Sequence, residues 1–298
     1  MELHLTSEQA LLRDSAAKFC AAAGPRAARA SRGGGFAPAR LREAGELGWL
    51  GMLVPTSAEG SGLGLTELAL VLEQAGRALV CEPIGLAAIA AAALAQGHAP
   101  HPLLPRAMRG NALMVPALQE TAHADPCTLH TRADGDDRAA RLTGRKISVC
   151  ADGADGFLVS AEARDGPALY YVARAAPGVG LAATPSVDGR GLATLTLDGA
   201  PADLVPARQS SRGAVAALTD LALVALSAEL LGVMEGAQEM TFAYLRLRKQ
   251  FGKPIGSFQA LQHKAVDIYI KTETTRSLLY QSRPPTIPIG STRRRRSR

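Results

Sequence analysis

The chain has 298 residues, of which 47% are hydrophobic and only 4% are aromatic. This composition favours a soluble protein of closely packed helices over an aromatic-rich β protein. The formal net charge is +6, but residues 282–298 hold six arginines and no acid, so the remaining chain has 27 Lys+Arg against 27 Asp+Glu. A neutral body argues against a nucleic-acid-binding protein, and a binder that uses the basic tail is the least favoured class.

Four cysteines are spread along the chain without a C-x-x-C pair: Cys20, Cys81, Cys127 and Cys150. This spacing indicates neither a metal site nor a disulfide framework, and it fits reduced thiols in a cytoplasmic protein. The first residues lack the basic segment and apolar run of a secretory signal. The apolar stretch 214–234 is interrupted by Asp220 and Glu229, so we expect a buried helix and no membrane span.

Residues 1–111 are expected to form an N-terminal helical domain. Thr6 and Gln9 resemble a capping box ahead of a helical apolar pattern. Further helices are predicted at Pro38–Leu47, Leu65–Leu79 and Ile84–Leu94.

Residues 112–210 change character and are expected to form a central antiparallel β-barrel-like domain. Apolar or alternating segments of strand length occur at Leu113–Leu118, Phe157–Ala161, Ala168–Ala173 and Ala193–Leu197. Residues 141–146 have a strand-and-turn pattern, and Asp-Gly pairs, the last at 198–199, are predicted to punctuate the strands.

Residues 211–281 return to a helical period. One long helix is predicted from Gly213 to Leu247, followed by a loop over 248–256 and a second helix reaching Gln281. Two long helices form half of a four-helix bundle, so the fold class is α+β multidomain with an incomplete C-terminal helical bundle. The apolar stripe near Leu226, Leu230 and Val233 would be exposed, which predicts poor solubility of the chain expressed alone.

Residues 282–298 are predicted to be a disordered Arg/Pro-rich tail. Its composition begins abruptly after the second helix, and we interpret it as a shifted reading frame or an aberrant terminus.

The segment Arg248-Lys-Gln250-Phe251-Gly252-Lys-Pro254-Ile255, followed by Phe258-Gln259, resembles the acyl-CoA dehydrogenase pattern R-x-Q-F-G-x-P-I-x-x-F-Q. The segment 48–55 and short matches near 118–120, 144–146 and 188–190 follow in family order. The chain is therefore identified as a C-terminally truncated or frame-shifted member of that family. The resemblance implies an FAD-dependent oxidoreductase of fatty acid or lipid catabolism that forms an α,β double bond in an acyl-CoA thioester.

The resemblance implies FAD between the β domain and the C-terminal helices, with a neighbouring subunit contributing. It assigns cofactor contacts to Arg248, Gln250, Phe251 and Gln259, and in the β domain to Gln119, Thr121, Ser148 and Cys150. A guanidinium suits the FAD pyrophosphate because it donates bidentate hydrogen bonds. Taken alone, Arg248 could be an exposed loop charge and Phe251 a core residue. Ser148 stands where the family often has Trp, and an ordinary strand residue is at least as good an interpretation.

The family base is usually a glutamate beyond the Arg248 motif, or in a minority of members a carboxylate on the first long helix. Counting back from Arg248 places the second position at Ala222, which cannot accept a proton. Asp220 points to nearly the opposite helix face, and Glu229 lies two turns further on, about 10 Å along the axis. The catalytic residue is therefore unknown, with Asp220 and Glu229 as candidates that a salt bridge or cap explains as well.

Two hypotheses follow. The chain is either an impaired acyl-CoA dehydrogenase, or a non-catalytic subunit that pairs with a complete homologue. The family implies homo- or hetero-oligomers with acyl-CoA dehydrogenase subunits and an electron-transferring flavoprotein as acceptor.

Overall fold

The computed structural model describes residues 5–22, 36–97, 100–122, 128–135, 140–186, 188–207 and 211–281. The Arg/Pro-rich tail 282–298 lies outside these ranges, so its predicted disorder stays a prediction. Close packing divides the chain into two compact units. Of the described residues, the helical unit comprises 5–22, 66–80 and 224–281, and the β unit comprises 36–65 and those between 81 and 223. The three boundaries predicted in chain order remain predictions.

The β unit begins with short helical elements. These are α3 (Pro38–Glu46), η1 (Trp49–Gly51), η2 (Thr56–Ala58), α5 (Ile84–Leu94) and α6 (Leu104–Met108). The bounds predicted for α5 agree with the structure, and α3 ends one residue earlier than predicted. Helix α5 packs on β1 and η1, and it is buried on almost every side. Its many alanines permit this close approach because they add little volume.

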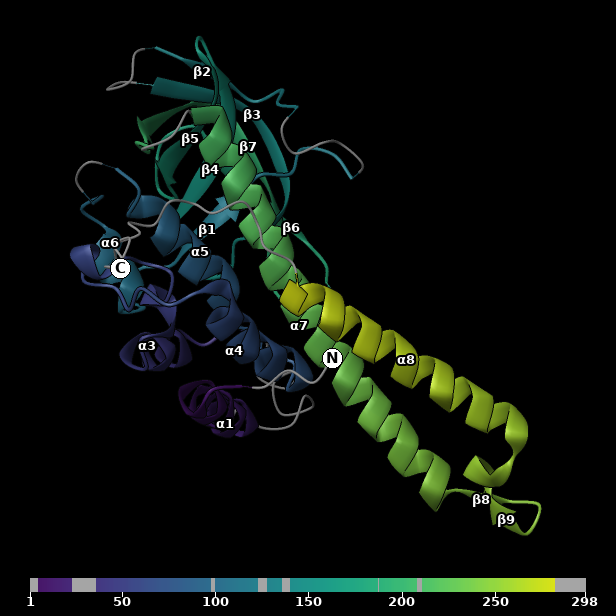
Figure 1. Cartoon of the computed structure of the whole chain (residues 1–298). Coiled ribbons are helices and arrows are strands. Elements are labelled where there is room, and N and C mark those ends of the chain that lie inside the picture. The colour runs from purple at the N-terminus through teal and green to yellow at the C-terminus, as the bar shows by residue number, and fades with distance from the viewer. Residues whose placement is uncertain are drawn as a thin grey trace, which may run out of the picture. The chain divides into compact units, whose positions relative to one another are not determined.

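The strands of the β unit form one sheet that closes on itself (Figure 1). They are β1 (Met114–Ala117), β2 (Arg132–Asp134), β3 (Ala140–Cys150), β4 (Gly156–Ala163), β5 (Gly166–Ala173), β6 (Val179–Thr184) and β7 (Leu192–Leu204). The order is β1-β4-β2-β3-β7-β5, a β4–β5 pairing completes the barrel, and β6 pairs with β7. The β-barrel-like architecture is confirmed, but β1–β4 and β2–β4 pair in parallel, so the sheet is mixed.

Two local predictions in the β unit differ from the structure. Residues 141–146 lie within the continuous strand β3, which absorbs Gly144 through a shift of register against β7 instead of turning. The Asp198–Gly199 pair does not end β7, because Gly199 adopts a φ of +59° at an irregularity inside the strand. The predicted alternation holds in β7, where Leu195 and Leu197 are buried and Thr196 is exposed.

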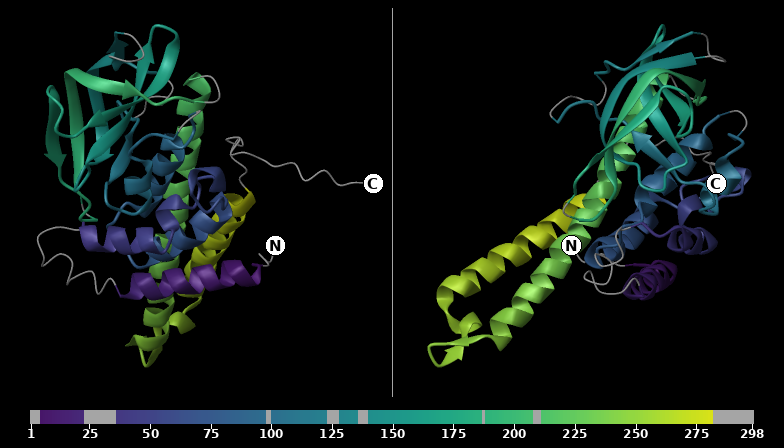
Figure 2. Two further views of the ribbon diagram at one scale, coloured as in Figure 1. Left: turned by 90° about the vertical axis from the view of Figure 1, so that its left-hand side faces the viewer. Right: turned by 180° about the vertical axis from the view of Figure 1, so that it is seen from behind.

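The helical unit contains α1 (Ser7–Ala21), α4 (Leu65–Arg77), most of α7 (Ser211–Leu247) and α8 (Gln259–Gln281). The Thr6–Gln9 capping box at α1 is confirmed. Helices α7 and α8 run antiparallel and are joined by a small hairpin (Figure 2). An added Cβ at Gly76 of α4 would overlap the carbonyl oxygen of Glu229 in α7, so the two backbones are in direct contact.

Helix α7 is long and apolar enough to cross a membrane by length and composition alone, with a window of mean hydropathy 1.9. Of this window, 61% is buried within the protein, which identifies a core helix and agrees with the sequence-based expectation. The predicted stripe is nevertheless exposed, with Leu226 at 39%, Leu230 at 62% and Val233 at 39%.

Candidate functional site

The cofactor residues predicted in the helical unit gather at the hairpin between α7 and α8. Strands β8 (Lys249–Gln250) and β9 (Lys253–Pro254) pair so that Phe251 and Gly252 form a two-residue loop. Their φ angles are +51° and +79°, as a type I′ turn requires at both positions. Glycine adopts this backbone readily, whereas a bulky phenylalanine there is strained. Such strain is often found at binding sites.

The side chains of this hairpin tip face solvent in the single chain. Phe251 is 91% exposed and meets Phe258 edge-on, with ring centroids 6.1 Å apart. The Lys253 ammonium lies 4.6 Å from the centroid of the Phe258 ring. Arg248 is also exposed, and within the described residues its guanidinium has no ion-pair partner. The tip therefore presents an aromatic ring and a guanidinium to solvent, where a ligand could bind them.

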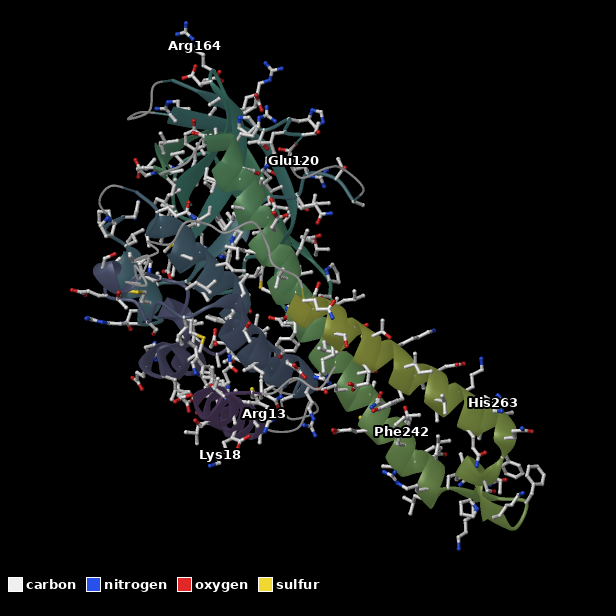
Figure 3. The ribbon with its side chains drawn as sticks, viewed as in Figure 1. Arg13, Lys18, Glu120, Arg164, Phe242 and His263 are labelled. Atoms are coloured by element: carbon white, nitrogen blue, oxygen red, sulfur yellow. The ribbon has the colours of Figure 1, made fainter. Side chains whose placement is uncertain are left out.

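Two amides complete the tip, because Gln250 and Gln259 are exposed as well. The backbone amide of Ile255 donates to the carbonyl oxygen of Arg248 at 2.8 Å, which fixes the base of the loop. His263 lies on α8 near the hairpin (Figure 3). The structure thus brings together all four residues that the sequence assigned to the cofactor in this unit.

The cofactor residues predicted in the β unit come from two segments that touch. Gln119 and Thr121 follow β1, and the Gln119 side-chain amide donates to the Thr121 carbonyl at 3.1 Å. The amide of Ile147 in β3 donates to the Gln119 carbonyl at 2.8 Å. Ser148 comes next, at a break in the β3–β7 register where its φ is +55°. Gln119, Thr121 and Ser148 are exposed, whereas Cys150 is 5% exposed and offers a ligand little surface.

A fully buried ammonium lies behind these two segments. The Nζ of Lys146 donates to the Glu120 Oε1 at 2.7 Å, the Ser160 Oγ at 3.0 Å and the Leu118 carbonyl at 3.3 Å. These are the three bonds that an ammonium can make. The Lys146 side chain is 0% exposed and that of Glu120 is 6% exposed. Figure 3 labels Glu120 beside the barrel strands.

Glu120 is held by more than the lysine. Its carboxylate also accepts from the backbone amides of His130 at 2.6 Å and Thr131 at 2.9 Å. Burial alone would raise the pKa of Glu120, but hydrogen bonds from Lys146, Thr131 and His130 outweigh it and lower the pKa to about 2. Burial lowers the pKa of Lys146, and its bond to Glu120 opposes that effect. We call Glu120, Lys146 and Ser160 the Lys146 cluster.

The Lys146 cluster was not predicted from the sequence, although a signal was present. Lys146 is four residues from the buried Leu142 on the same strand, and alternate strand residues share a face. A lysine on the inward face of a strand calls for a buried carboxylate partner.

A second buried polar group joins three helices of the helical unit. Arg276 of α8 forms ion pairs with Glu73 of α4 and Glu235 of α7, and the Tyr280 hydroxyl donates to Glu73 at 2.8 Å. Burial, followed by the nearby Glu73 carboxylate, raises the pKa of Glu235 to about 7. Burial alone would lower the pKa of Arg276, but both carboxylates together raise it. We call Glu73, Glu235, Arg276 and Tyr280 the Arg276 cluster.

The two candidate bases both lie on α7 but belong to different units. Asp220 is half-buried in the β unit. Glu229 is 7% exposed in the helical unit, beside the close crossing with α4. A general base must reach the proton that it abstracts, directly or through one water. The local surroundings favour neither carboxylate.

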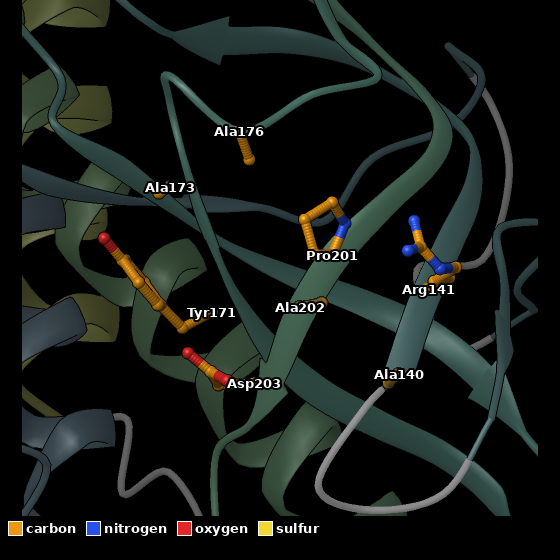
Figure 4. Close-up of a pocket in the computed structure, with 8 residues that line it drawn as sticks. All are labelled: Ala140, Arg141, Tyr171, Ala173, Ala176, Pro201, Ala202 and Asp203. Carbon is orange, nitrogen blue, oxygen red and sulfur yellow. The ribbon is translucent and has the colours of Figure 1, made fainter.

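A pocket of about 320 Å³ opens elsewhere on the β unit, where β5 and β7 separate beyond the Tyr171–Asp203 pairing. Figure 4 shows Tyr171 and Asp203 on one side of Pro201 and Arg141 on the other. None of the predicted site residues lines this pocket. In the described ranges, no group of three His, Cys, Asp or Glu side chains could hold a metal ion.

Comparison with known proteins places these features in one family. Residues 6–100 match the N-terminal domain of acyl-CoA dehydrogenases, and residues 213–283 match their C-terminal domain. The chain is 34% identical to acyl-CoA dehydrogenase FadE27 of Mycobacterium tuberculosis over 80% of its own length and 64% of the relative's length. It therefore spans somewhat less than two thirds of that relative.

Solved structures share the fold over most of the chain. A steroid ACAD variant of Tcur3481-Tcur3483 is 34% identical with a TM-score of 0.84, over 92% of this chain and 76% of that one. The ChsE4-ChsE5 complex from Mycobacterium tuberculosis is 29% identical with a TM-score of 0.84, over 94% and 78%. PigA, solved with FAD and proline, is 21% identical with a TM-score of 0.81 over 94% and 79%, which shows a common fold. The chain belongs to the acyl-CoA dehydrogenase family.

Proposed function

We propose that this chain carries FAD-binding residues of an acyl-CoA dehydrogenase that acts on the α,β-bond of an acyl-CoA thioester. The observation that carries this proposal is the hairpin tip, where the 248–259 motif presents Arg248 and Phe251 to solvent on a strained turn. An exposed guanidinium without an ion-pair partner within the described residues suits phosphate oxygens. A strained turn that holds an aromatic ring in water calls for a ligand.

Each unit contains residues whose chemistry suits contacts with FAD. In the helical unit, Arg248 would bind the pyrophosphate, and Gln250, Phe251 and Gln259 would add amide and aromatic contacts. In the β unit, Gln119, Thr121 and Ser148 offer exposed polar groups, whereas Cys150 is buried and would contact FAD only weakly. FAD, when bound, supplies the hydride acceptor. The protein's own residues bind and orient it, and in the described ranges no carboxylate is placed as an evident base.

We propose that the base comes from a partner subunit or from one of the chain's own carboxylates. Asp220 and Glu229 remain the internal candidates, and substitution to Asn and Gln tests them. We also infer a cytoplasmic protein of lipid catabolism that passes electrons to an electron-transferring flavoprotein. One of the similar structures, described as a steroid ACAD, supports a bulky lipid thioester as substrate.

The alternative function is that of a non-catalytic subunit paired with a complete acyl-CoA dehydrogenase. One specific observation favours it, because exposed apolar residues of α7 follow a four-three spacing typical of a helix-packing seam. The seam comprises Leu226, Leu230, Val233, Ala237, Met240, Tyr244 and Leu247, and all are exposed in the single chain. A helix from another subunit fits such a surface.

An anaerobic visible spectrum tests the proposal. The purified chain is mixed with FAD, freed of unbound flavin, and titrated with short, long and steroid-side-chain acyl-CoA thioesters. Bound flavin that bleaches supports an active dehydrogenase, and the Asp220→Asn and Glu229→Gln variants then locate the base. Bound flavin that bleaches only after a complete homologue is added supports the paired subunit. Absence of bound flavin, both alone and with a homologue, contradicts FAD binding.

A further inference from the structure

The two predicted cofactor segments of the β unit are far apart in the sequence, so non-covalent interactions must hold them next to each other. Residues 119–121 follow β1, whereas residues 147–150 end β3, more than twenty positions later in the chain. One backbone hydrogen bond links them directly, from the Ile147 amide to the Gln119 carbonyl at 2.8 Å. The net stability that a single such bond contributes is too small to fix an exposed loop.

The backbone at this point departs from regular sheet. The β3–β7 register is interrupted between Lys146 and Val149, so Ile147 turns its amide to Gln119 instead of to β7. Ser148 takes a φ of +55°, which costs a non-glycine residue free energy. Such a conformation persists only where neighbouring interactions determine it.

The Lys146 cluster supplies these interactions, because its members lie next to both segments. Lys146 immediately precedes Ile147, and Glu120 lies between Gln119 and Thr121. The ammonium binds the Glu120 carboxylate at 2.7 Å, and it also binds the Leu118 carbonyl one residue before Gln119. The Oγ of Ser160 in β4 accepts a third hydrogen bond from the ammonium at 3.0 Å.

We propose that the buried Lys146–Glu120 pair is the positioning element that holds the segments 119–121 and 147–150 in the arrangement that contacts FAD. The inference rests on the proposed function for the identity of the ligand, but the positioning itself concerns the protein alone. The pair touches neither segment's exposed groups, so both residues are positioning residues and not cofactor contacts.

Hydrogen exchange of the FAD-free chain tests the positioning step. Lys146→Met removes the ammonium and keeps the length of the side chain, and Ser160→Ala removes one anchor as a milder variant that retains the fold. Glu82→Gln is the matched control, because Glu82 is an ion-paired carboxylate of the same unit with a side chain 4% exposed. We expect the Ile147 amide to exchange at least about tenfold faster in both cluster variants, with Leu142 in β3 unchanged. Equal exchange at Ile147 in the cluster variants and in Glu82→Gln overturns the proposal.

FAD binding then tests the consequence. We expect the Kd for FAD to rise at least about tenfold in Ser160→Ala and further in Lys146→Met, together with an altered flavin circular dichroism band. Wild-type affinity and spectrum in variants that expose Ile147 would overturn the role toward the cofactor. A wild-type chain that fails to bind FAD while Ile147 still responds would sink the proposed function and leave the positioning of the two segments standing.

Discussion

The hairpin tip and the Lys146 cluster both support predicted cofactor contacts, but they are built in opposite ways. At the tip, Arg248 and Phe251 lie in solvent on a two-residue turn, with few contacts to hold them. In the β unit, Lys146 and Glu120 are buried, and each of their polar atoms has a partner. The contact residues themselves, Gln119 and Thr121, remain exposed beside that buried support.

This difference shows which residues determine binding in each unit. At the tip, the contacting residues themselves determine it, so a long and recognisable motif is needed there. In the β unit, the Lys146 cluster determines the backbone arrangement. The contact residues can therefore depart from the family pattern, as Ser148 does, while that arrangement is kept. Substitutions at the tip should therefore affect binding with only a small change in stability, and substitutions in the cluster should affect both strongly.

The largest effect is expected for Glu120→Ala, which leaves a buried ammonium without its counter-ion. Breaking a buried ion pair by removing one partner costs about 3–5 kcal/mol of the free energy of unfolding, measured by urea denaturation. Arg248→Ala should stay within about 0.5 kcal/mol of wild type, because its guanidinium is exposed. The double variant Glu120→Leu/Lys146→Met should recover part of the loss. Similar costs for Glu120→Ala and Arg248→Ala would break the comparison.

The next effect distinguishes two buried clusters by pH. Glu120, with its pKa lowered to about 2, contributes stability that is present above its ordinary value of 4.5 and is lost as the pH falls toward 2. Glu235 has the opposite sign, because a pKa raised to about 7 contributes stability that is present below 4.5 and is lost as the pH rises through 7. The groups that face it are Glu73, Arg276 and Tyr280.

For Glu235, the upper limit of this contribution is about 3 kcal/mol, from a pKa of 4.5 raised to about 7. The free energy of unfolding, measured at pH 5 and pH 8, should fall with rising pH, and Glu235→Gln should flatten the profile in this range. A profile that Glu235→Gln leaves unchanged would show that this carboxyl does not titrate there.

The sequence predicted those elements whose pattern is local. Helix α5 was placed by its uninterrupted apolar run, and α7 and α8 by their helical period and the glycines and prolines between them. The parallel pairing of β1 with β4 was missed, because pairing direction depends on topology and not on strand pattern. The Lys146–Glu120 pair joins residues far apart in sequence, and a lysine's burial depends on that distant partner.

The third effect concerns affinity at the tip. Arg248→Ala should raise the Kd for FAD by about 10- to 100-fold, since hydrogen bonds to charged groups contribute roughly 1.5–3 kcal/mol. Arg248→Lys should fall between, because an ammonium cannot bind phosphate in a bidentate manner. Arg246→Ala, an exposed arginine two residues away, is the matched control and should bind FAD normally. Equal losses of FAD affinity in Arg246→Ala and Arg248→Ala would mean that these arginines act only through their positive charge and that Arg248 makes no specific contact.

The smallest effect, and the one that separates strain from contact, is expected at Phe251. Asn tolerates the positive φ of the first turn position, so Phe251→Asn should raise the free energy of unfolding by about 0.5–1 kcal/mol. Phe251→Ala removes the same ring but keeps the strain, so it should not stabilise the protein. If the ring contacts FAD, both variants lose affinity equally despite their different stabilities. Unchanged affinity in both would mean that the strained turn serves another ligand, and the exposed ring would have to be explained by a protein partner.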